Sequence, residues 1–330
     1  MNLVSILMPV YNAEKHLAEA IESILNQSFT DFEFLIINDG STDRSEDIIL
    51  SFSDPRIRYI KNESNLKLIK TLNKGIQLCT GKYIVRMDAD DISHPERIQK
   101  QVEFMESNPE IGICGSWFEA FGEVENAIVK YKETHDEIMT RMFYQCHFCH
   151  PSIIIRGEIF NELKMHFDEN YSHAEDYEFY LRAAKKWKFH NLQEVLLKYR
   201  IHGESVSNKN KSIQIENSLK IKKQFFKELN TPIADVDLEA FENLNYQDYT
   251  QVNLESYRLR QLLESLWEGN KVHKRITIKF FENYLQNLWI NYCYHNADIL
   301  TYKKSNLLYS IDKLEEVNQI KWRIKSLLKN

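Results

Sequence analysis

Three carboxylates stand together at the end of a short apolar stretch of the sequence. The run Tyr-Ile-Val-Arg-Met at 83–87 is followed by Asp88, Ala89, Asp90 and Asp91. An apolar run of this length predicts a buried strand, so the carboxylates should emerge together at its carboxyl end. Open α/β sheets bind their ligands at this edge. Because neighbouring carboxylates repel one another, the cluster predicts either full hydration or a hard cation such as Mg2+ or Mn2+.

The same stretch also has a purely structural interpretation, a polar loop that opens a helix. Ser93 and Glu96 have the spacing of a capping box, and Pro95 would stand in the first helical turn. Aspartate-rich loops are common, so this stretch alone leaves both interpretations open.

Further polar clusters are expected at the ends of other elements, at Tyr11-Asn12, at Asp39–Asp43 and at Glu175-Asp176. Parallel strands place their carboxyl ends on one side, so the first two clusters should converge with the carboxylates at 88–91. Convergence favours a nucleotide cradle. In such a cradle Asp39 could accept the imide proton of a uracil base, Asp88 could hold ribose hydroxyls, and Asp90 could reach a metal that bridges two phosphates.

Alternating strand-like and helix-like periods over the first hundred residues predict the framework that positions these clusters. This alternation is typical of an α/β domain with a mostly parallel sheet. Strands are expected at 3–8, 32–37, 56–60 and from residue 81, and helices at 14–26, 66–78 and 96–107. Further along, strands are expected at 111–121, 151–156 and 195–201, and a helix at 175–186.

The character of the sequence changes near residue 208. A lysine-rich segment at 207–227 leads into long, glycine-poor stretches in which apolar residues recur at helical spacing. The chain is therefore predicted to have an α/β domain at 1–208 and a helical domain at 209–330.

Composition excludes several classes of protein. The 330 residues are 43% hydrophobic and 27% charged, which is typical of a soluble globular protein. A net charge of -6 provides no basic field for nucleic acid. The amino terminus does not resemble a signal peptide, and no segment approaches the roughly 20 apolar residues of a membrane span. Five scattered cysteines predict a reducing cytoplasm.

Other ligand-binding motifs are missing. No G-x-G-x-x-G and no P-loop occur in the sequence, and nine glycines leave little room for one. Phosphates would then need a metal in place of a backbone nest. The Cys146-x-x-Cys149 pair with His147 and His150 resembles half of a zinc site, but no second cysteine pair accompanies it.

Six motifs in order resemble the family 2 glycosyltransferases, inverting enzymes of the GT-A fold that transfer a sugar from a nucleotide donor. The motifs are Ser5–Asn12, Ile37–Asp43, Gly81–Asp91, His150-Pro151-Ser152, Glu175-Asp176 and Tyr199–His202. The resemblance covers residues 1 to about 205. It implies a Rossmann-like nucleotide-binding sheet with helices on both faces, followed by the helical region.

The resemblance also implies a role for each matching residue. The residues that would bind the nucleotide are Pro9, Tyr11, Asn12, Glu14, Asp39, Asp88 and Ala89. Asp176 would be the catalytic base, while Asp90 and His202 would hold Mn2+ or Mg2+. Contacts to the donor or acceptor sugar would come from His150, Glu175 and Arg200.

An inverting transfer is one in-line displacement at the anomeric carbon. It needs a carboxylate base for the acceptor hydroxyl and charge stabilisation for the departing diphosphate. Asp176 is expected near a helix start, where the helix dipole should lower its pKa and keep it ionised. The same position has a structural interpretation, in which Asp176 only stabilises the first helical turn. Arg86 is expected to pair with one of the carboxylates that follow it, in a structural role.

The expected partners are a nucleotide-sugar donor, most simply a UDP-sugar, and a saccharide or lipid-linked acceptor in cell-surface polysaccharide synthesis. The protein would then work in the cytoplasm, at the inner face of the plasma membrane. The lysine-rich entry and the tail at 322–329 could contact that membrane, form a solvated helix face, or belong to a homodimer interface. The rival hypothesis is a non-catalytic protein that binds nucleotide or glycan and assembles through its helices.

Overall fold

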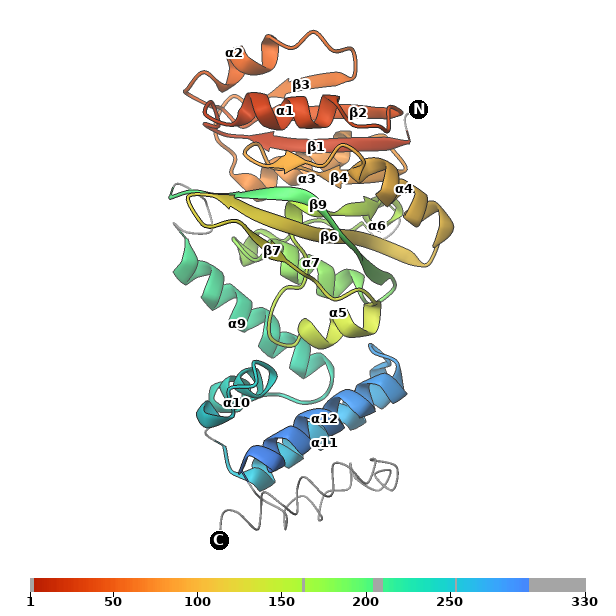
Figure 1. Ribbon diagram of the computed structural model, residues 1–330, viewed down its shortest axis with the longest axis vertical. Coiled ribbons are helices and arrows are strands. Elements are labelled where there is room, and N and C mark those ends of the chain that lie inside the picture. The colour runs from red at the N-terminus through yellow and green to blue at the C-terminus, as the bar shows by residue number, and fades with distance from the viewer. Residues whose placement is uncertain (1–2, 162–163, 204–209, 253, 297–330) are drawn as a thin grey trace. The chain divides into compact units, whose positions relative to one another are not determined.

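The computed structural model of the chain describes residues 3–161, 164–203, 210–252 and 254–296 (Figure 1). The chain divides into two compact units. The first comprises the residues up to Ile138 together with Cys146–Leu219, and the second comprises Met139–Gln145 and the residues from Lys220 onward. The predicted domain boundary at residue 208 lies outside the described residues.

A mixed sheet forms the centre of the first unit (Figure 1). Its strand order is β3-β2-β1-β4-β8-β6-β9-β5, with β7 paired to β6. Strands β1 to β4 are parallel neighbours, which confirms the parallel arrangement predicted for the first hundred residues. The strands are β1 Val4–Val10, β2 Phe32–Asn38, β3 Ile57–Lys61, β4 Tyr83–Arg86, β5 Ile92–Ser93, β6 Ile111–Gly122, β7 Ala127–Val129, β8 Ile154–Arg156 and β9 Lys188–Ile201.

Helices cover both faces of this sheet, as predicted. Successive side chains of a strand point to opposite faces, so Ile6, Met8 and Val10 join the apolar cluster with α1 (Leu17–Leu25), α2 (Ser45–Leu50) and α4 (Arg97–Ser107). Leu7 points the other way, toward Gly75 of α3 (Leu68–Leu78). The remaining helical segments of this unit are α5 His135–Arg141, η1 His150–Ser152, α6 Glu158–Asn161, η2 Glu169–Tyr171 and α7 Glu175–Ala183.

The second unit is helical, which confirms the prediction for the carboxyl-terminal region. Its elements are the later part of α9 (Lys211–Glu228), α10 Asp235–Asn245, η3 Tyr249–Gln251, α11 Ser256–His273 and α12 Ile278–Asn296. Phe143 contacts Phe225, Phe226 and Phe241 and stacks on Phe281 at 5.5 Å between ring centroids. The short segment at 139–145 therefore contributes a core side chain to this unit. No helix among the described residues is both long enough and apolar enough to cross a membrane, and the tail at 322–329 lies outside them.

Two local predictions were wrong. Ser93 does not cap a helix: it lies in β5, its hydroxyl accepts a hydrogen bond from Gln27, and α4 begins only at Arg97. The strand predicted at 195–201 begins at Lys188 instead, because β9 pairs along the whole length of β6. Irregularities in this pairing near Ser116 and Trp117 break the alternation that would mark the early part of β9 in the sequence.

Candidate functional site

The ends of β1 and β2 meet through Asn12. Its backbone N–H donates to the Ser41 hydroxyl at 3.0 Å, and its side-chain oxygen accepts from the Thr42 backbone N–H at 2.8 Å. Asn12 has a left-handed backbone with φ 49°, which asparagine tolerates better than most residues. The two polar clusters predicted to converge are therefore linked by hydrogen bonds.

Glu14 and Asp43 extend this link. The Glu14 backbone N–H donates to Asp43 at 3.0 Å, and the Glu14 carboxylate accepts from the Arg44 N–H at 3.0 Å. Asp43 also accepts from the Ser45 N–H at the start of α2. Burial acts to raise the pKa of Asp43, but hydrogen bonds from Ser45 and Glu14 outweigh it and lower the pKa. Both carboxylates are used to shape the loop that follows β2.

Asp39 is buried directly after β2. Its Oδ1 accepts hydrogen bonds from the Leu66 backbone N–H and the Asn62 amide, each at 2.8 Å, while Oδ2 has no partner among the described residues. Gly40 follows with φ 70°, and a Cβ there would lie 2.8 Å from the Ser64 backbone. Glycine at this position therefore lets the loop at 62–66 approach Asp39 closely.

An exposed aromatic ring lies at the end of the neighbouring strand. Pro9 pairs with Ile37, and Tyr11 follows β1 with 49% of its surface exposed. The strand pairing puts this ring at the same sheet edge as Asp39, whose N–H donates to the Val10 carbonyl at 2.8 Å. A planar polar ligand could stack on Tyr11 and donate to Asp39.

The three carboxylates after β4 form a tight group. Oxygens of Asp88, Asp90 and Asp91 all lie within 4.8 Å of one another, with Ala89 buried between the first two. Burial, followed by the charges of Asp88 and Asp90, raises the pKa of Asp91 well above its usual value. Burial and the charge of Asp90 raise the pKa of Asp88 in the same way, against the lowering effect of Arg86.

The end of β9 brings two more side chains to this group. His202 Nε2 lies 2.9 Å from Asp90 Oδ2. The Arg200 backbone N–H donates to Asp91 Oδ1 at 2.8 Å, and its Nε donates to the Asp90 carbonyl at 2.8 Å. Asp91 Oδ2 is buried and has no partner among the described residues. Carboxylate oxygens with one imidazole are a donor set that suits Mg2+ or Mn2+, so these residues fit the predicted metal.

Two residues near this group were missed by sequence reasoning. The His16 ring lies 5.7 Å from the His202 ring, and Glu19 pairs with the Arg200 guanidinium. Burial, followed by the charges of Arg200 and His202, lowers the pKa of His16. Their sequence positions, just before and within α1, gave no signal because the contact spans more than 180 residues.

A second group of polar side chains surrounds the start of α7. Asp176 accepts a hydrogen bond from the Tyr177 N–H at 2.8 Å, and the Cys146 sulfur lies 3.9 Å from its other oxygen. The expected lowering of the pKa of Asp176 by the helix terminus was wrong. Burial raises this pKa overall, despite the hydrogen bond from Tyr177 and the charge of Arg86, because removing a carboxylate from water disfavours its charged form.

Glu175 and His150 lie in this second group. Glu175 is buried, and burial followed by the charge of Asp176 raises its pKa to about 7. Burial and the charge of Arg86 lower the pKa of His150 well below its usual value, so its imidazole is neutral. Arg86 itself is buried and pairs with Asp88, which confirms its predicted ion pair. Arg86 therefore belongs to both groups of polar side chains.

The raised pKa of Glu175 predicts how stability depends on pH. The folded value of about 7 exceeds the ordinary 4.5, so Glu175 adds stability below pH 4.5 and loses this contribution as pH rises through 7. Glu175→Gln should therefore raise the free energy of unfolding at pH 9 by roughly 2–3 kcal/mol relative to its effect at pH 5. Thermal denaturation at both pH values measures this. Exposed Glu22→Gln is the control, and an equal effect of Glu175→Gln at both pH values would contradict the prediction.

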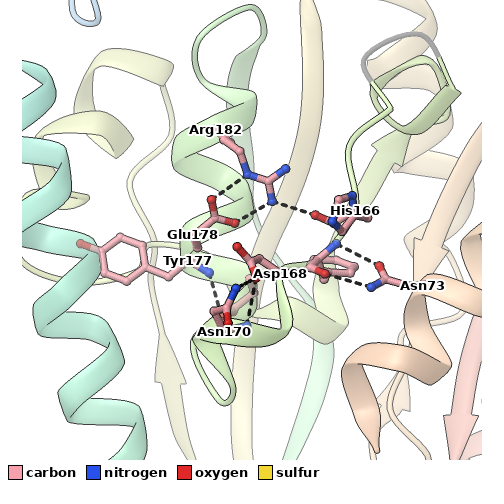
Figure 2. A network of polar contacts seen from close by, with 9 residues as sticks. Asn73, His166, Asp168, Asn170, Tyr177, Glu178 and Arg182 are labelled. Carbon is pink, nitrogen blue, oxygen red and sulfur yellow. Dashed lines mark hydrogen bonds and ion pairs between the residues drawn. The ribbon is translucent and has the colours of Figure 1, made fainter. Parts of the chain in front are cut away.

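Hydrogen bonds join the loop before α7 to α3 and to α7 itself (Figure 2). The Asn73 side chain of α3 donates to the Phe167 carbonyl and accepts from the Phe167 N–H, each at 2.9 Å. Within α7, Arg182 pairs with Glu178 at 2.6 Å and donates to the His166 carbonyl at 2.7 Å. The adjacent residues His166 and Phe167 of this loop are thus hydrogen-bonded to α7 and to α3, respectively.

The Arg97 side chain binds the backbone just before the carboxylates at 88–91. The sequence did not predict this structural role. Arg97 is fully buried, and its guanidinium donates to the Arg86 carbonyl at 2.9 Å and contacts the Met87 sulfur at 3.6 Å. Burial lowers the pKa of Arg97 to about 10, against the charges of Cys149 and Asp91. In the sequence Arg97 resembles an exposed residue of the first helical turn, because periodicity does not reveal which backbone groups a side chain meets.

The chain is similar to known proteins over most of its length. The family described as Glycosyl transferase family 2 matches residues 5–163. An uncharacterized glycosyltransferase of Haemophilus influenzae is 33% identical over 277 residues, which cover 80% of this chain and 85% of that protein. An uncharacterized glycosyltransferase of Methanocaldococcus jannaschii is 39% identical over 207 residues, which cover 60% of this chain and 71% of that protein.

Solved structures share the fold. The S. aureus protein TarS, in complex with UDP-GlcNAc, superposes with a TM-score of 0.59 at 16% identity over 90% of this chain and 92% of that one. The mannosyltransferase PcManGT from Pyrobaculum calidifontis, in complex with GDP-Man and Mn2+, has a TM-score of 0.53 at 12% identity over 100% of this chain and 88% of that one. These likenesses confirm the predicted GT-A fold.

Proposed function

Because the chain belongs to the family 2 glycosyltransferases, we propose that it transfers a sugar, with inversion, from a UDP-sugar to a saccharide or lipid-linked acceptor. One observation carries the proposal. The carboxylates of Asp88, Asp90 and Asp91 gather with His202 at the sheet edge that also holds Asp39. Asp176 lies in the neighbouring group, which Arg86 joins to these carboxylates.

Donor binding is assigned to the ends of β1, β2 and β4. Asp39 Oδ2 accepts the imide N–H of uracil, while the base lies on the exposed ring of Tyr11. Pro9, Asn12, Glu14 and Ala89 shape this pocket, and Asp88 accepts from the ribose hydroxyls. The support is the unpartnered oxygen of Asp39 and the exposure of Tyr11. Relatives of this fold have been solved with UDP-GlcNAc and with GDP-Man.

Asp90 and His202 would hold the divalent metal. When bound, Mn2+ or Mg2+ supplies charge stabilisation to the leaving diphosphate as a Lewis acid. The support is the carboxylate and imidazole donor set, together with a neighbour of this fold that was solved with Mn2+. Arg200 holds this loop through two hydrogen bonds: its Nε donates to the Asp90 carbonyl, and its backbone N–H donates to the Asp91 carboxylate.

Asp176 is the proposed general base. It accepts the proton of the acceptor hydroxyl while that oxygen forms a bond to the anomeric carbon. The bond between this carbon and the diphosphate oxygen breaks at the same time, on the opposite side of the sugar, so the configuration inverts. General-base assistance of this kind contributes about 10²- to 10⁴-fold to a rate.

We assign catalysis to residues 1–208 and partner contacts to residues 209–330. The acceptor would be a growing cell-surface polysaccharide or glycolipid at the cytoplasmic face of the plasma membrane. A non-catalytic assembly partner would not need a buried base next to a carboxylate cluster. The presence of both therefore favours the enzyme hypothesis over this alternative.

Thermal denaturation with nucleotides tests donor binding. UDP with Mn2+ should raise the melting temperature more than GDP or either component alone, because a ligand of the folded state adds stability according to its affinity. Asp39→Asn keeps an acceptor for Leu66 but places an N–H₂ group against the imide, so UDP affinity should fall at least about tenfold. Exposed Asp31→Asn is the control. Unchanged UDP affinity in Asp39→Asn would refute the assigned base contact.

A further inference from the structure

A chain of hydrogen bonds leads from the Asp39 carboxylate to α3. The Lys74 ammonium donates to the Asn62 side-chain oxygen at 2.6 Å, and the Asn62 amide nitrogen donates to Asp39 Oδ1 at 2.8 Å. The same nitrogen donates to the Thr71 hydroxyl at 3.2 Å. Asp39 and Asn62 are 3% and 2% exposed, and Thr71 is completely buried. The hydrogen bonds among these three side chains are therefore shielded from water.

The sheet and α3 together bring these residues to one place. Strands β2 and β3 pair in parallel up to their last residues, so Asp39 and Asn62, which directly follow them, lie at the same edge. The Asn62 backbone N–H also donates to the Asn38 carbonyl at 2.8 Å. Thr71 and Lys74 stand three residues apart in α3, a spacing that puts both on one helix face. Asn62 therefore bridges the end of β2 to α3.

The orientation of the Asn62 amide follows from the chemistry of its neighbours. An ammonium group only donates hydrogen bonds, and an ionised carboxylate only accepts them. Asn62 must therefore turn its oxygen toward Lys74 and its nitrogen toward Asp39. The Thr71 hydroxyl can donate or accept, so it does not select an orientation. Lys74 thus stabilises the one orientation in which Asn62 donates to Asp39.

This arrangement occupies one oxygen of Asp39 and leaves the other available. Oδ1 accepts from both the Asn62 amide and the Leu66 backbone N–H, each at 2.8 Å, while Oδ2 has no partner among the described residues. Two donors on Oδ1 fix the plane of the carboxylate, so Oδ2 is a positioned acceptor. Uracil offers a ring N–H to such an acceptor. Cytosine has a lone pair on the equivalent nitrogen, which a carboxylate oxygen repels.

We propose that Lys74 and Asn62 are positioning residues for base recognition, which hold Asp39 so that the site prefers uracil to cytosine. The inference rests on the proposed function, in which Asp39 contacts the base of a nucleotide donor. Lys74 and Asn62 act through Asp39 and do not themselves touch the nucleotide. Both lie outside the six motifs that carry the family resemblance.

Titration of UDP and CDP in the presence of Mn2+ tests the role of Lys74. Wild type should bind UDP at least about tenfold more tightly than CDP, because only uracil donates to Asp39. Lys74→Met keeps the length of the side chain but leaves the Asn62 oxygen without a donor, so the amide no longer holds Asp39. UDP affinity should then fall about tenfold while CDP affinity stays within about twofold. Lys70→Met is the control, since Lys70 is exposed on the same helix and pairs with exposed Glu169.

Two further variants test whether hydrogen bonding is responsible. Lys74→Arg retains a cationic donor, so its ratio of UDP to CDP affinity should stay within about threefold of wild type. Asn62→Asp keeps the shape of the side chain and an acceptor for Lys74, but it cannot donate to Asp39. Its ratio should fall about tenfold, as in Lys74→Met.

The ratio distinguishes positioning of Asp39 from a general structural role. An equal loss of UDP and CDP affinity in Lys74→Met, or an unchanged ratio in either Lys74→Met or Asn62→Asp, would overturn the inference. The proposed function has a separate test in Asp39→Asn. If Asp39→Asn loses the preference for UDP and the other two variants keep it, only the inference fails. If wild type binds no nucleotide, the proposed function fails as well.

Discussion

Asp176→Asn is expected to lower sugar transfer by about 10²- to 10⁴-fold while leaving the donor affinity within roughly twofold of wild type. The asparagine amide keeps the size and the hydrogen-bonding ability of the carboxylate at the start of α7 but cannot accept the acceptor's proton. Transfer is measured as acceptor-dependent product formation, and donor affinity by titration. Because burial raises the pKa of Asp176, transfer by the wild type should begin to fall, as the medium is acidified, at a higher pH than an ordinary aspartate would give.

A matched control separates catalysis from helix stabilisation. Asp47 also stands in the first turn of a helix, α2, and is exposed. Asp47→Asn loses the same favourable interaction with a helix terminus, about 0.3–1 kcal/mol, but should retain full transfer. Loss of donor binding together with transfer in Asp176→Asn would show that Asp176 has a structural role instead.

Asp90→Ala should produce the second large effect, the loss of metal-dependent donor binding. Without this carboxylate the site loses a hard oxygen ligand, and His202 loses its partner at 2.9 Å. The metal supplies several kcal/mol of charge stabilisation in sites of this kind, so transfer should fall by at least about 10²-fold. Titration of UDP with and without Mn2+ measures the coupling directly.

The expected pattern in this titration has two parts. Wild type should bind UDP more tightly with Mn2+ than with EDTA, and Asp90→Ala should bind UDP with one weak affinity under both conditions. Asp47→Ala, far from the carboxylate group in the sequence and exposed, should behave as wild type. Equal enhancement by Mn2+ in wild type and Asp90→Ala would exclude Asp90 as a metal ligand.

Local patterns were sufficient to predict the sheet edge. The alternation of apolar strands and amphipathic helices in the first hundred residues predicts parallel strands, and parallel strands must bring Asn12, Asp39 and Asp88 to one edge. The turn residues between these strands and helices are also recognisable in the sequence. Gly40 is an example, with a positive φ and a close approach to the Ser64 backbone. These features depend on neighbours in the sequence, which is why the sequence reveals them.

Contacts between distant segments could not be predicted in this way. The Arg97 side chain bonds to the carbonyl of Arg86, and the Arg200 guanidinium pairs with Glu19. A periodic pattern identifies the buried face of an element but not the element that covers it. The pKa of Asp176 was misjudged for the same reason, since the helix terminus is visible in the sequence whereas the burial that outweighs it is not.

The helical unit shows the same limit. The spacing of apolar residues predicts the helices of this unit. Phe143 also belongs to the core of the helical unit, although the residues before and after its segment belong to the α/β unit. No pattern in the neighbouring sequence predicts this. The early part of β9 was missed because its pairing with β6 is interrupted by register shifts.

Release of UDP from UDP-sugars in the presence of Mn2+ tests the central claim most directly, that the carboxylates at 88–91 form a metal-dependent donor site for sugar transfer. Wild type should release UDP from at least one of the common neutral UDP-sugars, and Asp90→Ala should release it no faster than a blank without protein. If wild type releases no more UDP than Asp90→Ala from any of these donors, the claim is contradicted.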